Sequence, residues 1–327
     1  MDVGTLVADA RRGRPRAVAR LITLVENAAA APGGDERLRE VMAAFATVTG
    51  PEAEGGRGPY GARVIGLTGS PGVGKSTSTG MLIRAFRRRG RRVGVLAVDP
   101  SSPFTGGALL GDRVRMQEHA TDPEVFIRSM ASRGHLGGLA WATPQALRVL
   151  DAAGCDVILV ETVGVGQAEV DVARLADTTV VLLAPGMGDG IQAAKAGILE
   201  VADVFVVNKA DRDGAQDLVR ELRNTVAPLR GPWRPPIVST VASKGEGADD
   251  LLAALDKHAA YLDESGELRR RRLARARDEI ETIALARLRA RFAAEGRERR
   301  LDRLAERLLA AETDPYTAAD ELLADLG

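Results

Sequence analysis

The chain has 327 residues, of which 45% are hydrophobic and 28% are charged, and its 45 basic residues balance its 45 acidic residues. A net charge of zero provides no overall attraction to nucleic acid or to an anionic membrane, and no apolar run approaches the roughly 20 residues of a membrane-spanning helix. The single cysteine, Cys155, excludes a disulfide within the chain, and the three histidines are too scattered for a multi-ligand metal site. Because the N-terminal sequence lacks the apolar core of a signal peptide, we expect a cytoplasmic protein.

The first segment, residues 1–58, is predicted to be a helical extension that ends in a linker. Apolar residues recur at helical spacing from Val18 to Val25 and again from Leu38 to Phe45. The glycine- and proline-rich stretch that starts at Gly50 then indicates a domain boundary.

Residues 59–262 are predicted to form one α/β domain with a doubly wound, mostly parallel sheet. Short apolar runs alternate with helical stretches, and several of the runs are continuously apolar, which is typical of strands covered on both faces. The expected strands are residues 63–68, 93–98, 124–128, 156–161, 178–184, 203–208 and 236–240.

A phosphate-binding loop is expected directly after the first of these strands. The sequence from Gly69 to Ser76, GSPGVGKS, fits G-x-x-x-x-G-K-[ST] at every fixed position, and it leads into a predicted helix. Such a loop directs consecutive backbone N–H groups at one point, and the helix N-terminus adds partial positive charge. Lys75 would reach the outer phosphates, and the Ser76 hydroxyl would bind Mg²⁺. The residues expected around the phosphates are Gly69, Ser70, Pro71, Gly72, Val73, Gly74, Lys75, Ser76 and Thr77.

Two aspartates that follow are candidates for catalysis. Asp99 ends the second predicted strand, which we expect to neighbour the phosphate loop, so Asp99 is predicted at the Mg²⁺ site. Asp112 lies in a predicted switch loop. Each aspartate also has a structural interpretation, Asp99 as a turn former and Asp112 as a helix cap.

A further acidic residue, Glu161, ends the fourth predicted strand. The sequence from Glu161 to Gly164, ETVG, resembles the D-x-x-G element of GTPases with glutamate in place of aspartate. A carboxylate there can hold the Mg²⁺ shell directly or through water, and Gly164 lets a backbone N–H approach the terminal phosphate. No glutamine directly follows Gly164, and the nearest is Gln167. We therefore expect hydrolysis that is slow alone and accelerated by a partner.

The base of the nucleotide is expected to be guanine. Asn208-Lys-Ala-Asp211 fits the N-K-x-D pattern at the carboxyl end of the sixth predicted strand. Asp211 can accept hydrogen bonds from the ring N1–H and the 2-amino group, a donor pair that adenine lacks, and Lys209 would lie along the base. After the next strand, Val241-Ala242-Ser243 takes the place of the usual Ser-Ala-x loop, so that the Ala242 N–H could reach the guanine carbonyl although the usual serine is lost.

Residues 263–327 are predicted to form a C-terminal helical arm for dimerisation. The segment is rich in Arg, Ala, Leu and Glu and has no strand signal, and its basic run from residue 267 is interpreted as a solvated helix face. An apolar stripe along the arm needs a partner surface, and such appendages often form oligomer interfaces. The stripe consists of Ile280, Ile283, Leu285, Leu288, Leu301, Leu304, Leu308 and Leu309.

The chain resembles the MeaB/ArgK family of P-loop GTPases over about residues 60–255. The resemblance is carried by the blocks GSPGVGKS, DPSSPFTGGALLGDRVRM, SRGHLGGLA, ETVGVGQAEVDVA and PGMGDGIQAAKAGILEVADVFVVNKAD, and by the trailing GEG. It implies a homodimeric GTPase that is a chaperone of an adenosylcobalamin-dependent mutase, usually methylmalonyl-CoA mutase. The GTPase would gate cofactor loading and protect the mutase from inactivation, and isobutyryl-CoA mutase is an alternative partner.

The resemblance also implies roles for single residues. It matches five of them to the phosphate and Mg²⁺ positions: Lys75, Ser76, Asp99, Asp112 and Glu161. It further implies a third switch loop, which signals to the mutase and contains Asp189, Gln192 and Lys195. The ligands implied are Mg²⁺ and GTP or GDP, and the chain shows no cobalamin site of its own.

Other functions remain open at this point. An ATP-using kinase linked to amino-acid transport is an older label for this family, and the N-K-x-D pattern argues against it. A GTP-controlled scaffold with negligible turnover would have the same motifs. A nickel-insertion GTPase shares the core but would need a Cys/His-rich metal site, which one cysteine and three histidines do not provide.

Overall fold

The computed structural model describes residues 2–30, 35–46, 61–99, 117–119, 121–131, 142–162, 168–186, 200–227, 231–292 and 298–324. The chain divides into two compact units, Met1–Arg269 and Arg270–Gly327. Within the described ranges, no helix combines the length and the apolar character that crossing a membrane requires.

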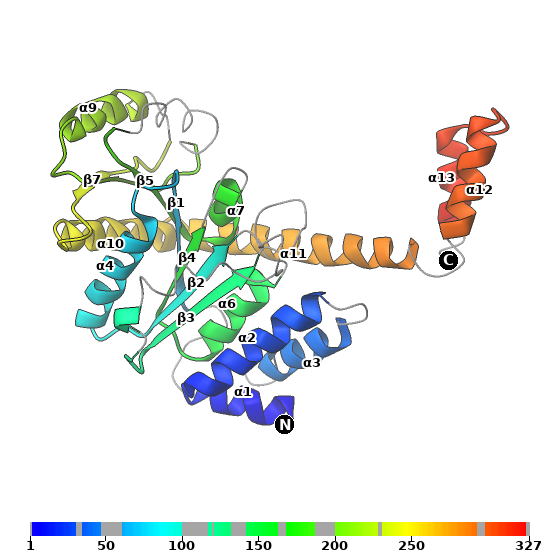
Figure 1. Ribbon diagram of the computed structural model, residues 1–327, viewed down its shortest axis with the longest axis horizontal. Coiled ribbons are helices and arrows are strands. Elements are labelled where there is room, and N and C mark those ends of the chain that lie inside the picture. Colours follow the sequence, from blue (N-terminus) through cyan, green and yellow to red (C-terminus); the bar gives the residue numbers. More distant parts are fainter. Residues whose placement is uncertain are drawn as a thin grey trace. The chain divides into compact units, whose positions relative to one another are not determined.

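A seven-stranded parallel sheet forms the centre of the first unit (Figure 1). Its strands lie in the order β3-β2-β4-β1-β5-β6-β7, and every neighbouring pair is parallel. Their bounds are β1 Arg63–Thr68, β2 Val93–Asp99, β3 Val125–Ala131, β4 Val157–Thr162, β5 Thr178–Leu183, β6 Val204–Asn208 and β7 Ile237–Thr240. The predicted doubly wound α/β fold is confirmed, and all the expected strands are present with small shifts at their ends.

Helices cover both faces of this sheet. One face carries α4 (Lys75–Arg88) and α10 (Ala248–Glu264), and the other carries α6 (Thr143–Ala152), α7 (Ala168–Leu175) and α9 (Ala215–Val226). A hydrophobic core lies on each face of the sheet, and successive residues of a strand point into opposite cores. In β4, for example, Leu159 packs on the α4 side and Ile158 on the α6 side. Because both faces are buried, the strands read as continuous apolar runs in the sequence. A short 3-10 helix, η1 (Gln117–His119), precedes β3.

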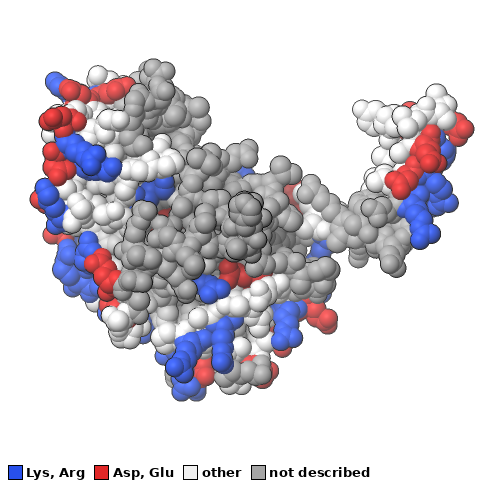
Figure 2. All heavy atoms as spheres, in the orientation of Figure 1, with Lys and Arg blue, Asp and Glu red and all other residues white. Residues whose placement is uncertain are grey.

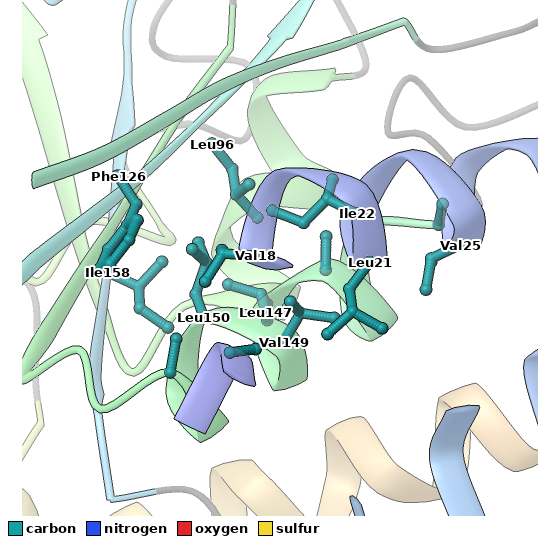
Figure 3. Close-up of a cluster of buried hydrophobic side chains, with 14 of the residues drawn as sticks. Val18, Leu21, Ile22, Val25, Leu96, Phe126, Leu147, Val149, Leu150 and Ile158 are labelled. Carbon is teal, nitrogen blue, oxygen red and sulfur yellow. The ribbon is translucent and has the colours of Figure 1, made fainter. Parts of the chain in front are cut away.

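The N-terminal helices share the core on the α6 side. They are α1 (Val3–Arg11), α2 (Pro15–Ala30) and α3 (Asp35–Ala46). Figure 3 shows Val18 and Ile22 of α2 beside Leu96 of β2, Phe126 of β3 and Leu150 of α6. The apolar spacing of this segment therefore serves burial against the sheet domain, which makes these helices part of the first unit.

Three aspartates, of which Asp177 and Asp203 are buried, connect the amino ends of neighbouring strands. Each precedes one strand and accepts a hydrogen bond from a backbone N–H near the start of an adjacent strand. These bonds run from Arg92 N to Asp156 (2.7 Å), from Val64 N to Asp177 (3.0 Å) and from Thr179 N to Asp203 (2.8 Å). Backbone donors that would otherwise be unsatisfied at the strand ends are thereby paired.

Ion pairs neutralise the basic stretch between α4 and β2. On the face shown in Figure 2, basic and acidic side chains of the described residues lie close to one another. Each arginine of the stretch 87–92 has a carboxylate partner: Arg87 with Asp122, Arg88 with Asp249, Arg89 with Asp256, Arg91 with Asp156 and Arg92 with Glu124. The positive charge of this arginine-rich stretch is therefore balanced by neighbouring carboxylates.

The second unit is helical. It contains most of α11 (Glu267–Phe292), α12 (Glu298–Leu309) and α13 (Pro315–Ala324). Arg307 Nη1 pairs with Glu321 Oε2 at 2.8 Å and joins α12 to α13. Of the predicted apolar stripe, Leu304 is buried, whereas several other members are exposed: Ile280, Leu285, Leu288, Leu301, Leu308 and Leu309.

Candidate nucleotide-binding site

The predicted motifs meet at the carboxyl edge of the sheet. The phosphate loop connects β1 to α4, the N-K-x-D motif follows β6, and the predicted base loop follows β7. β1 lies between β4 and β5, where the chain order along the sheet reverses. Open parallel sheets bind ligands in the crevice at such a reversal.

Two glycines give the phosphate loop its shape. Gly69 has φ +141° and Gly74 has φ +97°, backbone angles that residues with a Cβ rarely adopt. A Cβ on Gly69 would collide with the Leu182 carbonyl oxygen, and a Cβ on Gly74 would collide with the Asn208 amide. Gly74 is also the N-cap of α4 and provides no capping side chain. The backbone N–H groups of the first turn can therefore serve an anion.

The Lys75 side chain folds over the same loop. Its Nζ donates hydrogen bonds to the Gly69 carbonyl and to the Ser70 carbonyl, the latter at 3.2 Å. Lys75 and Ser76 are both largely buried, with exposed fractions of 8% and 9%. The ammonium group is thus held at the loop that the sequence predicts to surround the phosphates.

Glu161 lies beside this loop. It is fully buried in β4, and it pairs in register with Leu67 of β1, two residues before the phosphate loop. Thr79 Oγ1 of α4 donates a hydrogen bond to Glu161 Oε2. The structure therefore places the Lys75 ammonium and the Glu161 carboxylate near the end of β1, and Ser76 in the first turn of α4.

The strand that ends in Asp99 is not the immediate neighbour of β1 in the sheet. β2 pairs with β3 and with β4, and β4 separates it from β1. The chain passes from β1 to β2 and on to β3, and β4 then lies between β1 and β2. Strands that follow one another in the sequence are therefore not always neighbours in the sheet. Asp99 still ends β2 at the carboxyl edge, and the placement of its side chain lies outside the described residues.

Several other predicted residues lie outside the described ranges. They are Asp112, Gly164, Gln167, Asp189, Gln192 and Lys195. Their roles remain predictions.

Asn208 joins the phosphate loop to the predicted base loop. The side chain is buried, and its Nδ2 donates to the Val73 carbonyl at 2.8 Å. Its Oδ1 accepts from Ala242 N at 3.1 Å and from Thr240 Oγ1 at 3.2 Å. The N–H predicted to reach the guanine carbonyl is therefore engaged with Asn208 in this structure.

The two charged residues of the N-K-x-D motif also have defined partners. Lys209 has φ +57°, and its Nζ donates to the Gly72 carbonyl at 2.7 Å. The Asp211 carboxylate pairs with Lys244 Nζ at 3.0 Å, and this hydrogen bond lowers the pKa of Asp211. Asp211 remains 41% exposed, so its ionised carboxylate is accessible to a ligand.

The base loop closes on itself. Val241 is buried and forms a bridge with Glu246, whereas Ser243 is exposed. Lys244 N donates to the Val241 carbonyl at 2.9 Å, which directs the chain back toward Asp211. The Val-Ala-Ser loop is thus ordered by a bridge and by Asn208.

Sequence reasoning missed Thr79 and Lys244. Thr79 lies three residues after Ser76, a spacing that places both on one face of a helix, and this was the available signal. Lys244 directly follows the predicted base loop, but its partner Asp211 lies 33 residues earlier. Nothing in the local pattern indicates that pairing.

Comparisons with known proteins identify similar sequences and a similar fold. Residues 18–297 match a family model described as "Methylmalonyl Co-A mutase-associated GTPase MeaB". A putative GTPase of Pyrococcus abyssi is 46% identical over 330 residues, which cover 99% of this chain and 97% of that protein. The mouse protein "Methylmalonic aciduria type A homolog, mitochondrial" is 40% identical over 214 residues, which cover 64% of this chain and 52% of that protein. A crystal structure described as a LAO/AO transport system kinase has a TM-score of 0.71 and 25% identity, and the match covers 99% of this chain and 97% of that one.

Proposed function

The chain belongs to the MeaB family of P-loop GTPases, and from this premise we propose that it is a GTP-dependent chaperone of an adenosylcobalamin-dependent acyl-CoA mutase. The observation that carries the proposal is the family match over residues 18–297, because the family description names a mutase. A mouse relative named for methylmalonic aciduria supports the same partner class. Methylmalonyl-CoA mutase is the proposed partner, with isobutyryl-CoA mutase as the alternative.

The site supports GTP as the ligand. In the proposed complex, backbone N–H groups of residues 69–77, apart from Pro71, bind the phosphates, and Lys75 leaves the loop carbonyls to bind the outer phosphates. Asp211 accepts from the guanine N1–H and 2-amino group. Because Asn208 contacts both Val73 and Ala242, a change at the base loop is transmitted directly to the phosphate loop.

The residues beside the phosphate loop fit Mg²⁺. The Ser76 hydroxyl and the Glu161 carboxylate are oxygen donors, which this ion prefers, and Glu161 is buried next to β1. We place Ser76, Glu161 and Asp99 in the Mg²⁺ shell, directly or through water. When bound, the ion neutralises charge that develops on the phosphates during hydrolysis.

Turnover is proposed to depend on the partner. Asp112 or Gln167 would orient the attacking water, and the loop with Asp189, Gln192 and Lys195 would respond to the mutase. Partner binding would order these groups around the terminal phosphate, as in GTPases that wait for an activator. The outcome would be cofactor loading that proceeds only in one nucleotide state.

The second unit is proposed to form a homodimer interface. Ile280 is 69% exposed and Leu309 is 88% exposed, and other apolar residues of the same helices are exposed as well. An apolar surface of this kind indicates a protein interface. A second copy of the chain is the proposed partner, because most soluble oligomers are homo-oligomers with closed symmetry.

Phosphate release under multiple turnover tests the chaperone proposal. We expect slow release by the protein alone and a stimulation of at least about ten-fold, equivalent to roughly 1.4 kcal/mol, by the cognate mutase. The variant Lys75→Ala serves as the inactive control. No stimulation by either mutase would contradict the proposal and favour a GTP-controlled scaffold.

One alternative is favoured only by the description of the similar crystal structure, which names a transport system kinase. Competition between GTP and ATP for a fluorescent GDP analogue distinguishes this alternative. A preference for ATP would support the kinase, whereas the Asp211 carboxylate predicts displacement by GTP.

A further inference from the structure

We propose that Thr79 is a positioning residue for Glu161, and that it determines through this contact how strongly the nucleotide site binds Mg²⁺. Thr79 Oγ1 of α4 donates a hydrogen bond to Glu161 Oε2 at the end of β4. The inference rests on the proposed role of Glu161 in the Mg²⁺ shell. It adds a residue that touches neither the nucleotide nor the ion.

The contact lies in a fully buried environment. Thr79 and Glu161 both have exposed fractions of 0%. A hydrogen bond to an ionised carboxylate is stronger than a neutral one, and a low local dielectric strengthens it further. Loss of the Thr79 hydroxyl would remove a donor that water cannot readily replace.

One helix face presents both hydroxyls. Ser76 and Thr79 are three residues apart in α4, so their side chains share a face, and α4 packs against β1 and β4. Thr79 Oγ1 also lies 3.1 Å from the Lys75 carbonyl. Both oxygens are within reach of the single hydroxyl hydrogen, and we assign it to Glu161 because a carboxylate is the stronger acceptor.

The use of glutamate at this position explains why the contact matters. A glutamate side chain has one more rotatable bond than an aspartate, and fixing that bond costs conformational entropy. Thr79 is β-branched and has few side-chain rotamers. A rigid donor on α4 therefore holds the longer carboxylate in one orientation before Mg²⁺ arrives.

The test measures binding of a non-hydrolysable GTP analogue in excess EDTA and in excess Mg²⁺. The dissociation constant in EDTA divided by that in Mg²⁺ reports how much Mg²⁺ strengthens binding, without any hydrolysis. A lower ratio means a smaller contribution of Mg²⁺. Thr79→Val keeps the shape and removes the hydroxyl, and we expect it to lower the ratio about five-fold or more. Its affinity in EDTA should stay within about two-fold of the parent, because the phosphate-loop contacts remain. Thr79→Ser keeps the hydroxyl but not the β-branch, so its ratio should lie closer to that of the parent than to that of Thr79→Val, with unchanged affinity in EDTA.

Glu161→Gln separates this inference from the proposed function. If Glu161→Gln lowers the ratio and Thr79→Val does not, Thr79 has no positioning role, and the metal role of Glu161 stands. If neither variant lowers the ratio, the role of Glu161 fails and the inference fails with it. Equal weakening of binding by Thr79→Val in EDTA and in Mg²⁺ would indicate a merely structural role and would also overturn the inference.

A second variant covers the case in which Thr79→Val does not fold. Thr79→Cys has the size of Thr79→Ser but a much weaker donor. A ratio for Thr79→Cys below that of Thr79→Ser, at equal affinity in EDTA, supports the inference. Equal ratios for the two variants would contradict it.

Discussion

At the scale of single residues, one buried amide carries much of the site's organisation. Asn208 donates to the carbonyl of Val73 in the phosphate loop and accepts from the N–H of Ala242 in the base loop. The loops proposed to bind the phosphates and the base are thus both hydrogen-bonded to this one side chain. Gly74 has no Cβ where the Asn208 amide lies. The glycine of the phosphate loop and the asparagine of the base motif are therefore one packing unit.

Removal of the Lys75 ammonium should weaken GTP binding. We expect Lys75→Ala to lose about 10- to 100-fold in affinity, because charged hydrogen bonds to the outer phosphates contribute roughly 1.5–3 kcal/mol. Calorimetric titration with a non-hydrolysable GTP analogue measures the effect. The control is Lys257→Ala, an exposed lysine of α10 that should bind like the parent. Unchanged affinity in Lys75→Ala would refute the phosphate-site assignment.

Substitution of Asp211 should reduce guanine selectivity. In Asp211→Asn, one acceptor oxygen becomes an NH₂ group that faces the guanine donors. The preference for GDP over ADP should fall about ten-fold or more, because the paired donors on the base lose an acceptor. Loss of the Lys244 pair should contribute little, because the pair is exposed to solvent. Asp213→Asn, an exposed neighbour, should keep the full preference, and a selective Asp211→Asn protein would contradict the base-site assignment.

At the scale of elements, the aspartates at the amino ends hold adjacent strands together. Asp177 is buried and accepts from Val64 N, which links the segment before β5 to β1. Asp177→Ala should lower the free energy of unfolding by about 1–3 kcal/mol, because the Val64 N–H loses its acceptor in a buried place. Urea unfolding measures this change. The exposed Asp213→Ala should have little effect, and an equal effect of the two variants would contradict the role of Asp177.

The strands could be predicted from the sequence, whereas their order could not. A run such as Val157–Val160 is apolar at every position, and that local pattern is sufficient to indicate a buried strand. The insertion of β4 between β1 and β2 depends on where crossover helices pack. For this reason the sequence did not reveal that β4, and not the strand ending in Asp99, lies beside β1.

The candidate site divides in the same way. Gly69, Gly74 and Asn208 could be singled out because each belongs to a motif that is local in sequence, whereas the contacts of Asn208 with Val73 and Ala242 could not. Thr79 and Lys244 could not, because their partners Glu161 and Asp211 come close only once α4 lies on β4 and the base loop has turned back. Such contacts between distant segments follow from tertiary packing alone.

At the scale of the whole molecule, the exposed apolar residues of α11 and α12 predict a homodimer. The double variant Ile280→Glu with Leu309→Glu should yield a monomer in sedimentation velocity, because two charges would have to be buried in the interface. GTP affinity should be unchanged, since the nucleotide site belongs to the first unit. Ala319→Glu, at an exposed small residue of α13, is the matched control and should remain dimeric. A parent protein that is already monomeric would contradict the proposed interface.

The central claim is that the nucleotide state of this GTPase controls its association with an adenosylcobalamin-dependent mutase. The most direct measurement is the dissociation constant between the protein and purified methylmalonyl-CoA mutase, with GDP and with a non-hydrolysable GTP analogue, and with isobutyryl-CoA mutase in parallel. The account predicts that the two nucleotides change the affinity for one mutase by about ten-fold or more, and that Lys75→Ala abolishes the difference. Equal affinity in both nucleotide states, or no binding to either mutase, would contradict it.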